Sequence, residues 1–211
     1  MLTMRCGKIV CVGQNYREHI REMRSDEPAE PVLFIKPSTA MISDGEAIII
    51  PEGIGAVHHE VELALIVGKG GKQIEEGDAL SHISHATVLN DVTARDVQSA
   101  ARKAGLPWAL AKGMDTFAPL GAPVPLELVP DLHSLDLELR VNGELRQKGN
   151  TAQMIFPPEK LISYISRFMT LEPGDVIATG TPSGVGPLRP GDVVEATVHG
   201  VGTLRNPVRS R

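Results

Sequence analysis

Two carboxylates stand at the start of an apolar segment with strong β-strand propensity. Glu60 and Glu62 are two residues apart, and the apolar run that follows them continues to Val67. Because side chains alternate between the faces of a strand, this spacing predicts that both carboxylates point the same way. A divalent cation would offset their mutual repulsion, and carboxylate oxygens suit Mg2+, Mn2+ or Ca2+. On its own the pair is more typical of an edge strand with a solvated acidic face, so a metal site needs further ligands.

Asp91 is a third candidate ligand. It follows a predicted strand, Ile83 to Leu89, and precedes a predicted helix, Ala94 to Lys103. With Glu60 and Glu62 it would give three oxygen ligands and leave about three octahedral positions for water or substrate. An open coordination sphere is what a catalytic metal requires. The alternative is that Asp91 only stabilises the start of the helix.

His19 and Glu22 form a second pair, on a polar helix predicted over Asn15 to Arg24. Three residues apart, they share a helix face and can hydrogen-bond. A carboxylate that binds one imidazole nitrogen fixes the tautomer and raises the basicity of the other nitrogen, as in a catalytic dyad. The spacing alone fits an ordinary surface pair equally well.

Two further segments could bind anions. Lys112 lies among small and apolar residues, where a partly desolvated ammonium could bind a substrate carboxylate or stabilise an enolate. A surface lysine is the alternative. The glycine-rich stretch from Thr179 to Gly186 could present backbone N–H groups to an anion, although it lacks the lysine of a phosphate-binding loop. A simple tight turn is as compatible with its composition.

Composition excludes several classes of protein. The 211 residues carry a formal charge of −5 without a basic cluster, so nucleic acid is not an expected partner. No apolar run reaches the length of a membrane span, and Ile9 to Val12 is too short for a signal-peptide core. Cys6 and Cys11 have neither metal-binding spacing nor distant partners, which is typical of a reduced cytoplasmic protein.

The secondary-structure pattern indicates a strand-dominated α+β domain that spans residues 1–211. Asn142-Gly143 predicts a two-residue hairpin turn, and Pro158 opens an amphipathic helix that is predicted to run to Met169. Ser25 to Pro31 is expected to be a polar loop. The other strands are expected over Lys8 to Val12, Val32 to Ile35, Ala47 to Ile50, Glu60 to Val67, Ile83 to Leu89 and Leu135 to Val141.

The residues of the motifs and the order of the motifs along the chain are together more specific than any single motif. The motifs are Val12-Gly13-Gln14-Asn15-Tyr16, His19 with Glu22, Phe34-Ile35-Lys36-Pro37-Ser38-Thr39-Ala40, His59-Glu60-Val61-Glu62, Asn90-Asp91-Val92-Thr93-Ala94-Arg95-Asp96, Lys112-Gly113 and Thr179-Gly180-Thr181-Pro182. From about Lys8 to Pro207 the chain closely resembles the fumarylacetoacetate hydrolase family. The resemblance is closest to its small acylpyruvase and oxaloacetate decarboxylase branch.

This resemblance implies a mixed β-roll or β-sandwich fold, a single catalytic domain and a homodimer. It implies Mg2+ or Mn2+ as the cofactor, with Ca2+ an ion that crystals could hold instead. Residues 8–31 would contain a mobile lid. The implied roles are metal binding for Glu60, Glu62 and Asp91, water activation for His19 and Glu22, enolate stabilisation for Lys112, and substrate contact for Arg17, Gln98 and Thr181. Position 17 differs from the mammalian branch, which leaves the substrate preference open.

The expected partner is a small 2-oxo acid, and three reactions of it share one enolate. Hydrolysis of an acylpyruvate such as fumarylpyruvate or acetylpyruvate needs an oriented base most, so we rank it first. Decarboxylation of oxaloacetate would not need the dyad. Tautomerisation of oxaloacetate or isomerisation of a 2-hydroxydienoate would use His19 to carry a proton. A binding protein without turnover would have no use for the dyad.

Overall fold

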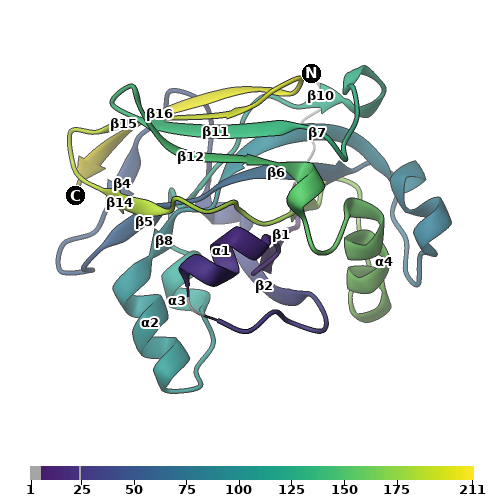
Figure 1. The fold of residues 1–211 in the computed structure, drawn as a ribbon, viewed down its shortest axis with the longest axis horizontal. Helices are drawn as coiled ribbons and strands as arrows, with labels where there is room; N and C mark the ends of the chain where they lie inside the picture. Colours follow the sequence, from purple (N-terminus) through teal and green to yellow (C-terminus); the bar gives the residue numbers. More distant parts are fainter. Residues whose placement is uncertain (1–5, 24) are drawn as a thin grey trace.

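Two β-sheets packed face to face form the body of the protein in a computed structural model that describes residues 6–23 and 25–211 (Figure 1). In spatial order, the larger sheet consists of β10 (Val124–Pro125), β7 (Ile83–Asn90), β6 (Val61–Val67), β13 (Val176–Ala178), β1 (Lys8–Gly13) and β2 (Val32–Pro37). The other main sheet consists of β12 (Glu144–Asn150), β11 (Asp136–Val141), β15 (Val193–Val198), β16 (Gly202–Ser210) and β4 (Ile48–Ile50).

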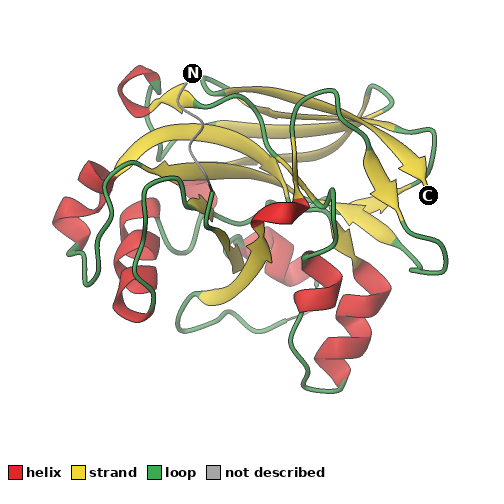
Figure 2. Cartoon of the chain, turned by 180° about the vertical axis from the view of Figure 1, so that it is seen from behind, coloured by secondary structure: helices red, strands yellow, loops and turns green. Residues whose placement is uncertain are grey.

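Short strands and helices complete the fold. The small sheets are β14 (Gly186–Leu188) with β5 (Val57–His59) and β8 (Thr93–Ala94), and β3 (Met41–Ile42) with β9 (Ala118–Pro119). The α-helices are α1 (Arg17–Glu22), α2 (Arg95–Lys103), α3 (Ala109–Lys112) and α4 (Pro158–Phe168). Short 3-10 helices span Ser38–Ala40, Glu76–His82, Leu126–Leu128 and Thr151–Gln153. Most of the helical segments lie on the side away from the five-stranded sheet (Figure 2). This mixture of strands and helices confirms the predicted α+β class.

Strand β6 lies in the middle of the six-stranded sheet, and its two faces serve different cores. Leu63 and Leu65 belong to the large apolar core that both main sheets share, whereas Ala64 and Ile66 pack in a second core on the opposite face. Because residues alternate along a strand, Glu62 points to the second face. The edge-strand interpretation of this segment is therefore wrong. Glu60 lies outside β6, in the break after β5, so its direction does not follow from strand alternation alone.

The local turn and helix signals are confirmed. Strands β11 and β12 pair through the predicted two-residue turn, in which Asn142 has φ 53° and Gly143 has φ 82°. Positive φ at both central positions is what a type I′ turn requires, and Asn-Gly meets this at little cost. Helix α4 has Pro158 in its first turn, as predicted, and ends at Phe168.

Two helix starts differ from the prediction. Helix α1 covers only Arg17–Glu22, because Tyr16 is extended and pairs with Met154 in an isolated bridge; Arg24 lies outside the described residues. The segment Thr93-Ala94-Arg95-Asp96, with an acid three residues after a threonine, has the sequence pattern of a helix N-cap, but Thr93 does not cap α2. Thr93 forms part of β8, which pairs with β5, and its hydroxyl donates to the carbonyl of Asp91. This pairing keeps the chain extended, so α2 begins only at Arg95.

Two further expectations concern the whole chain. Within the described residues, none of the helices has the length and apolar character that crossing a membrane would require. Cys6 and Cys11 are buried and are not joined in a disulfide, as expected.

Candidate active site

Three acidic side chains converge where β6 and β7 pair. One carboxylate oxygen from each of Glu60, Glu62 and Asp91 lies within 4.8 Å of the other two, and all three residues are buried. The antiparallel register sets Val61 opposite Asn90, and the Asp91 N–H donates to the carbonyl of Glu60 at 2.8 Å. The predicted convergence of these residues is confirmed.

Cations surround two of the three carboxylates. The buried Lys36 ammonium donates to Asp91 Oδ1 at 2.5 Å, and Arg95 pairs with Glu60. The Lys112 ammonium bridges the two acids, at 2.9 Å from Glu60 Oε2 and 2.5 Å from Asp91 Oδ2. Asp91 is thus not a helix cap, and Lys112, at 2% exposure, is not a surface lysine.

Glu62 is the carboxylate left without a cation within the described part of the chain. Its Oε2 accepts the Gly180 N–H at 2.8 Å, yet the side chain is almost fully buried. Burial, then the charges of Asp91 and Glu60, raise the pKa of Glu62 well above its ordinary value. Burial acts in the same direction on Glu60, but Lys112 and Arg95 outweigh it and hold the pKa of Glu60 low.

This donor set fits a divalent metal ion. It consists of buried carboxylate oxygens, which are the ligands that Mg2+ and Mn2+ prefer. A metal ion would also compensate the Glu62 charge, which the nearby lysines and arginine do not. Glu60, Glu62 and Asp91 are therefore the residues that could hold it.

The dyad lies at the same cleft. His19 Nδ1 is 3.0 Å from Glu22 Oε2, which confirms the predicted pairing within one helical turn. The His19 side chain is only 9% exposed, whereas that of Glu22 is 33% exposed. Both carboxylate oxygens of Glu22 also lie within reach of the Gly184 N–H, at 3.1 and 3.3 Å. Glu22 is thus fixed from outside its own helix.

The glycine-rich loop supports both groups. Gly180 donates its N–H to Glu62, and Gly184 donates to Glu22. Gly184 has φ +96°, and a Cβ there would lie 2.2 Å from the carbonyl oxygen of Arg146, so only glycine fits. The sequence suggested that this loop could present its N–H groups to an external anion. For the N–H groups of Gly180 and Gly184 this expectation is corrected, because each donates to a carboxylate of the protein.

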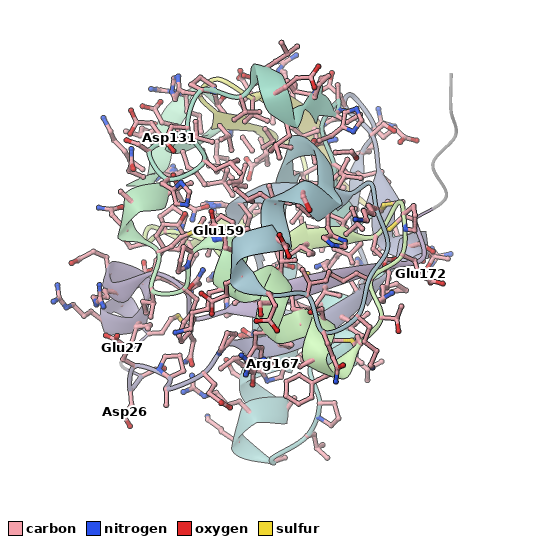
Figure 3. The ribbon with its side chains drawn as sticks, turned by 90° about the vertical axis from the view of Figure 1, so that its right-hand side faces the viewer. Asp26, Glu27, Asp131, Glu159, Arg167 and Glu172 are labelled. Atoms are coloured by element: carbon pink, nitrogen blue, oxygen red, sulfur yellow. The ribbon has the colours of Figure 1, made fainter. Side chains whose placement is uncertain are left out.

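Most of the predicted site residues line one cleft. These are His19, Glu60, Glu62, Asp91, Gln98, Lys112 and Thr181. Arg17 is separate: its guanidinium pairs with Glu27 at 3.2 Å, and it lines another pocket together with Lys148 and Pro182. Figure 3 shows Glu27 at the periphery of the molecule.

Three supporting residues had no assigned role in the sequence. Lys36 and Arg95 lie within quoted motifs, and a lysine inside an apolar strand was a usable signal. Gln147 gave none. From β12 it accepts from the Val61 N–H, lies 2.9 Å from His59 Nδ1 and donates to Thr181 Oγ1. It therefore ties the five-stranded sheet to the segment that carries Glu60 and Glu62.

Comparison with known proteins agrees with this geometry. The bovine (Bos taurus) mitochondrial oxaloacetate tautomerase FAHD1 is 49% identical over 197 residues, which is 93% of this chain and 89% of the relative. The structure of fumarylpyruvate hydrolase from Pseudomonas aeruginosa, solved with Mn2+ and pyruvate, matches with a TM-score of 0.95 at 35% identity. The match covers 99% of this chain and 91% of the hydrolase chain.

An isomerase has a similar structure. The 5-carboxymethyl-2-hydroxymuconate delta-isomerase from Mycobacterium smegmatis has a TM-score of 0.88 at 43% identity, over 98% of this chain and 80% of its own. The family described as fumarylacetoacetate (FAA) hydrolase C-terminal matches residues 8–209. With nearly the whole chain matched, the protein belongs to the fumarylacetoacetate hydrolase family of enzymes.

Proposed function

We propose that the protein is a Mg2+- or Mn2+-dependent hydrolase that cleaves acylpyruvates into pyruvate and a carboxylic acid. The observation that carries this proposal is the single cleft that joins the Glu60, Glu62 and Asp91 cluster to the His19–Glu22 pair. When bound, the metal would act as a Lewis acid on the 2-oxo acid end of the substrate.

The residues of the chain supply the proton transfers. With Nδ1 bound to Glu22, His19 has Nε2 available to take a proton from water. The water oxygen bonds to the distal carbonyl carbon, and the carbon-carbon bond to the pyruvyl part then breaks. Its electron pair enters the pyruvate enolate, which the Lys112 ammonium can stabilise by donating to its oxygen. His19 then returns the proton to the enolate carbon, which completes pyruvate.

Oxaloacetate tautomerisation is a second candidate, favoured by the 49% identity to the bovine oxaloacetate tautomerase. Here His19 would take a proton from the carbon between the two carbonyl groups, and Lys112 would stabilise the resulting enolate; protonation of the enolate oxygen would then give the enol. Loss of carbon dioxide from oxaloacetate could pass through a similar enolate without the dyad. A dyad that is already assembled favours the two reactions that need a base.

The test is a parallel assay of acetylpyruvate and oxaloacetate with Mg2+, Mn2+ or EDTA. Pyruvate release reports hydrolysis or decarboxylation, and the ultraviolet absorbance of enol-oxaloacetate reports tautomerisation. We expect metal-dependent pyruvate release from acetylpyruvate. Enol conversion without pyruvate release from acetylpyruvate would replace hydrolysis with tautomerisation, and turnover that survives EDTA would contradict the metal dependence.

Four further assignments belong to this proposal. Residues 8–31 would contain a lid over the cleft, and Gln98, Thr181 and Arg17 would contact substrate; Arg17 would have to leave Glu27 to do so.

The protein would form a homodimer in the cytoplasm, a reducing compartment that suits the buried free thiols of Cys6 and Cys11. Light scattering coupled to size exclusion tests the dimer.

A further inference from the structure

Both carboxylate oxygens of Glu60 and of Asp91 already contact cations. Arg95 pairs with Oε1 of Glu60. Lys36 lies 2.5 Å from Oδ1 of Asp91. The remaining oxygens, Glu60 Oε2 and Asp91 Oδ2, accept from the Lys112 ammonium at 2.9 and 2.5 Å. A metal ion that binds both acids must therefore share an oxygen with one of these cations or take the place of one.

Sharing the oxygens with the Lys112 ammonium is unfavourable. Mg2+ binds carboxylate oxygens at about 2.1 Å, so an ammonium that kept its hydrogen bonds to the same two oxygens would lie within about 5 Å of the metal. Two positive charges at that separation repel strongly where water is excluded. Lys112 is 2% exposed and Asp91 is fully buried, so water screens this repulsion little. We therefore expect one cation to move when the metal binds.

Lys112 is the cation with the fewest other partners. Lys36 also donates to the carbonyl of Val92 at 3.0 Å. Arg95 also donates to Gln98 Oε1 at 2.6 Å. Within the described residues, Lys112 hydrogen-bonds to the two carboxylates and to no other group. Its ammonium ends a flexible four-carbon side chain, so it can turn without any movement of the backbone, and it is the easiest of the three cations to displace.

The ring of Phe34 offers the Lys112 ammonium a second partner. Nζ lies 4.8 Å from the ring centroid, within the distance at which the face of an aromatic ring attracts a cation. Phe34 and Lys112 both line the cleft. The ring of Trp108 packs against Phe34 at 5.7 Å between centroids, which restricts the orientation of Phe34. The ammonium can therefore stay over this ring while its N–H groups turn from the carboxylates into the cleft.

The charge balance of the site favours the same movement. The three carboxylates of the cluster are matched by three cations, Lys36, Arg95 and Lys112. When all three carboxylates are ionised, a divalent ion leaves two excess positive charges. A dianion neutralises them, and the enolate of a 2-oxo acid is one, because it carries a carboxylate and an enolate oxygen. An ammonium that leaves the carboxylates would meet this ligand in the cleft.

We propose that Lys112 exchanges partners when the metal binds, and that Phe34 is the positioning residue for its second location. The metal takes Glu60 Oε2 and Asp91 Oδ2, and the ammonium stays over the Phe34 ring and donates to an anionic oxygen of the ligand. One lysine thus neutralises the acids first and binds the ligand afterwards, so ligand binding depends on the metal. The inference rests on the proposed metal site, but none of its tests requires hydrolysis.

Two calorimetric titrations test the exchange, first with Mn2+ and then with oxalate added to Mn2+-saturated protein. Oxalate is a dianion without a hydrocarbon part, so apolar packing does not contribute to its affinity. Lys112→Met should bind Mn2+ at least about tenfold more tightly than the wild type, because the competing cation is gone. It should bind oxalate at least about tenfold more weakly, because a charge-assisted hydrogen bond is lost.

Lys36→Met is the matched control, since it removes the same charge from the other oxygen of Asp91. It lowers the repulsion of the metal, so Mn2+ affinity should rise here too, but oxalate affinity should stay within about threefold of the wild type. Equal losses of oxalate affinity in Lys36→Met and Lys112→Met would show a general effect of charge and overturn the exchange. Lower or unchanged Mn2+ affinity in Lys112→Met would also overturn it.

Variants of Phe34 test the positioning role. Phe34→Leu keeps an apolar side chain but removes the ring face, so oxalate affinity should fall about fivefold while Mn2+ affinity stays within about twofold. Phe34→Tyr retains a ring face and should restore most of the oxalate affinity. Phe168→Leu removes an exposed ring that does not line the cleft, and it should change neither affinity. Equal oxalate affinities of Phe34→Leu and the wild type would remove Phe34 from the inference.

A crystal structure of the wild type with Mn2+ and oxalate tests the exchange without any variant. Nζ of Lys112 should lie beyond about 3.5 Å from Glu60 Oε2 and Asp91 Oδ2, and within about 6 Å of the Phe34 ring centroid. An ammonium still bonded to both carboxylates overturns the exchange.

The outcomes separate this inference from the proposed function. If acetylpyruvate is not hydrolysed but Lys112→Met shifts the two affinities in opposite directions, the proposed function fails and the exchange stands. If acetylpyruvate is hydrolysed and both affinities fall in Lys112→Met, the function stands and the exchange fails. A wild type that does not bind Mn2+ would overturn both.

Discussion

The carboxylate cluster and the dyad are held in different ways. Glu62 lies on the central strand β6 and Asp91 directly follows β7, and Lys36 reaches Asp91 from β2, so extended hydrogen-bonded ladders position these residues. His19 and Glu22 lie on a helix of six residues, which is too short to be stable in isolation. The comparison teaches that the metal-binding geometry is built into the sheet, whereas the position of the base depends on contacts made by α1.

The loop that contains Gly180 and Gly184 connects the two regions. It donates one N–H to Glu62 and another to Glu22, and Gln147 anchors it through Thr181 and the carbonyl of Pro182. A displacement of this loop would therefore affect both regions, whereas a change in one carboxylate should affect one.

The largest effect is expected from Glu62→Gln, which breaks the cluster alone. Mn2+ affinity should fall at least about 100-fold and turnover should be lost, because an anionic ligand is removed. Since the raised pKa of Glu62 means that its charged form is disfavoured, the metal-free variant should be as stable as the wild type or more stable. Calorimetry and thermal unfolding measure both quantities.

The control for the Glu62→Gln prediction is the pH dependence of the unfolding free energy, measured without metal. A carboxyl group with a raised pKa stabilises the fold below its ordinary value of 4.5 and loses this contribution as the pH rises through the raised pKa. Wild-type stability should therefore decline over that range, and Glu62→Gln should lack this decline. Reduced stability of metal-free Glu62→Gln at neutral pH would contradict the account.

Next in size is Lys36→Met, which leaves Asp91 without one of its buried partners. Removing one member of a buried ion pair costs about 3 kcal/mol of unfolding free energy. A bound metal would compensate Asp91, so Mn2+ should restore part of the loss. Urea unfolding with and without Mn2+ measures this, with the exposed Lys103→Met as control. A loss that Mn2+ does not reduce would place Lys36 outside the metal site.

Glu22→Gln should affect the dyad alone. It keeps an acceptor for the Gly184 N–H but replaces the carboxylate that binds His19 Nδ1 with a neutral amide, so kcat should fall about 10- to 100-fold. Mn2+ affinity should stay within about twofold of the wild type. Steady-state kinetics with acetylpyruvate and a Mn2+ titration decide, and an unchanged kcat would remove Glu22 from the mechanism.

Gln147→Leu should have the smallest effect on catalysis, and it acts on both regions. It leaves the Val61 N–H and the Pro182 carbonyl without a partner, which costs about 1–3 kcal/mol of stability. Because the loop supports Glu62 and Glu22, both Mn2+ affinity and kcat should fall by a few fold. If only stability changes, the loop does not connect the two regions.

The features that the sequence predicted correctly are those that neighbouring residues specify. Asn142-Gly143 and Pro158 specify a turn and a helix start through their own backbone preferences, and the structure confirms both. The His19–Glu22 contact follows from one helical turn. The resemblance of the ordered motifs then gave the family and fold class.

What the sequence missed depends on pairing between distant segments. Lys36 meets Asp91 across 55 residues because of where β2 lies, and Gln147 reaches His59 across 88 residues from the other sheet. Thr93 looked like a helix cap, but pairing of β8 with β5 overrode the local signal. The ion pair between Arg17 and Glu27 could likewise not be predicted from residue spacing, because it joins helix α1 to the loop that follows it.

The most direct test of the central claim, that the cluster binds the metal while the dyad supplies the base, is one experiment on His19→Ala. Mn2+ affinity by calorimetry and pyruvate release from acetylpyruvate are measured on the same sample. The account predicts wild-type Mn2+ affinity with turnover reduced about 100- to 10,000-fold. Retained turnover, or loss of Mn2+ binding together with turnover, would contradict it.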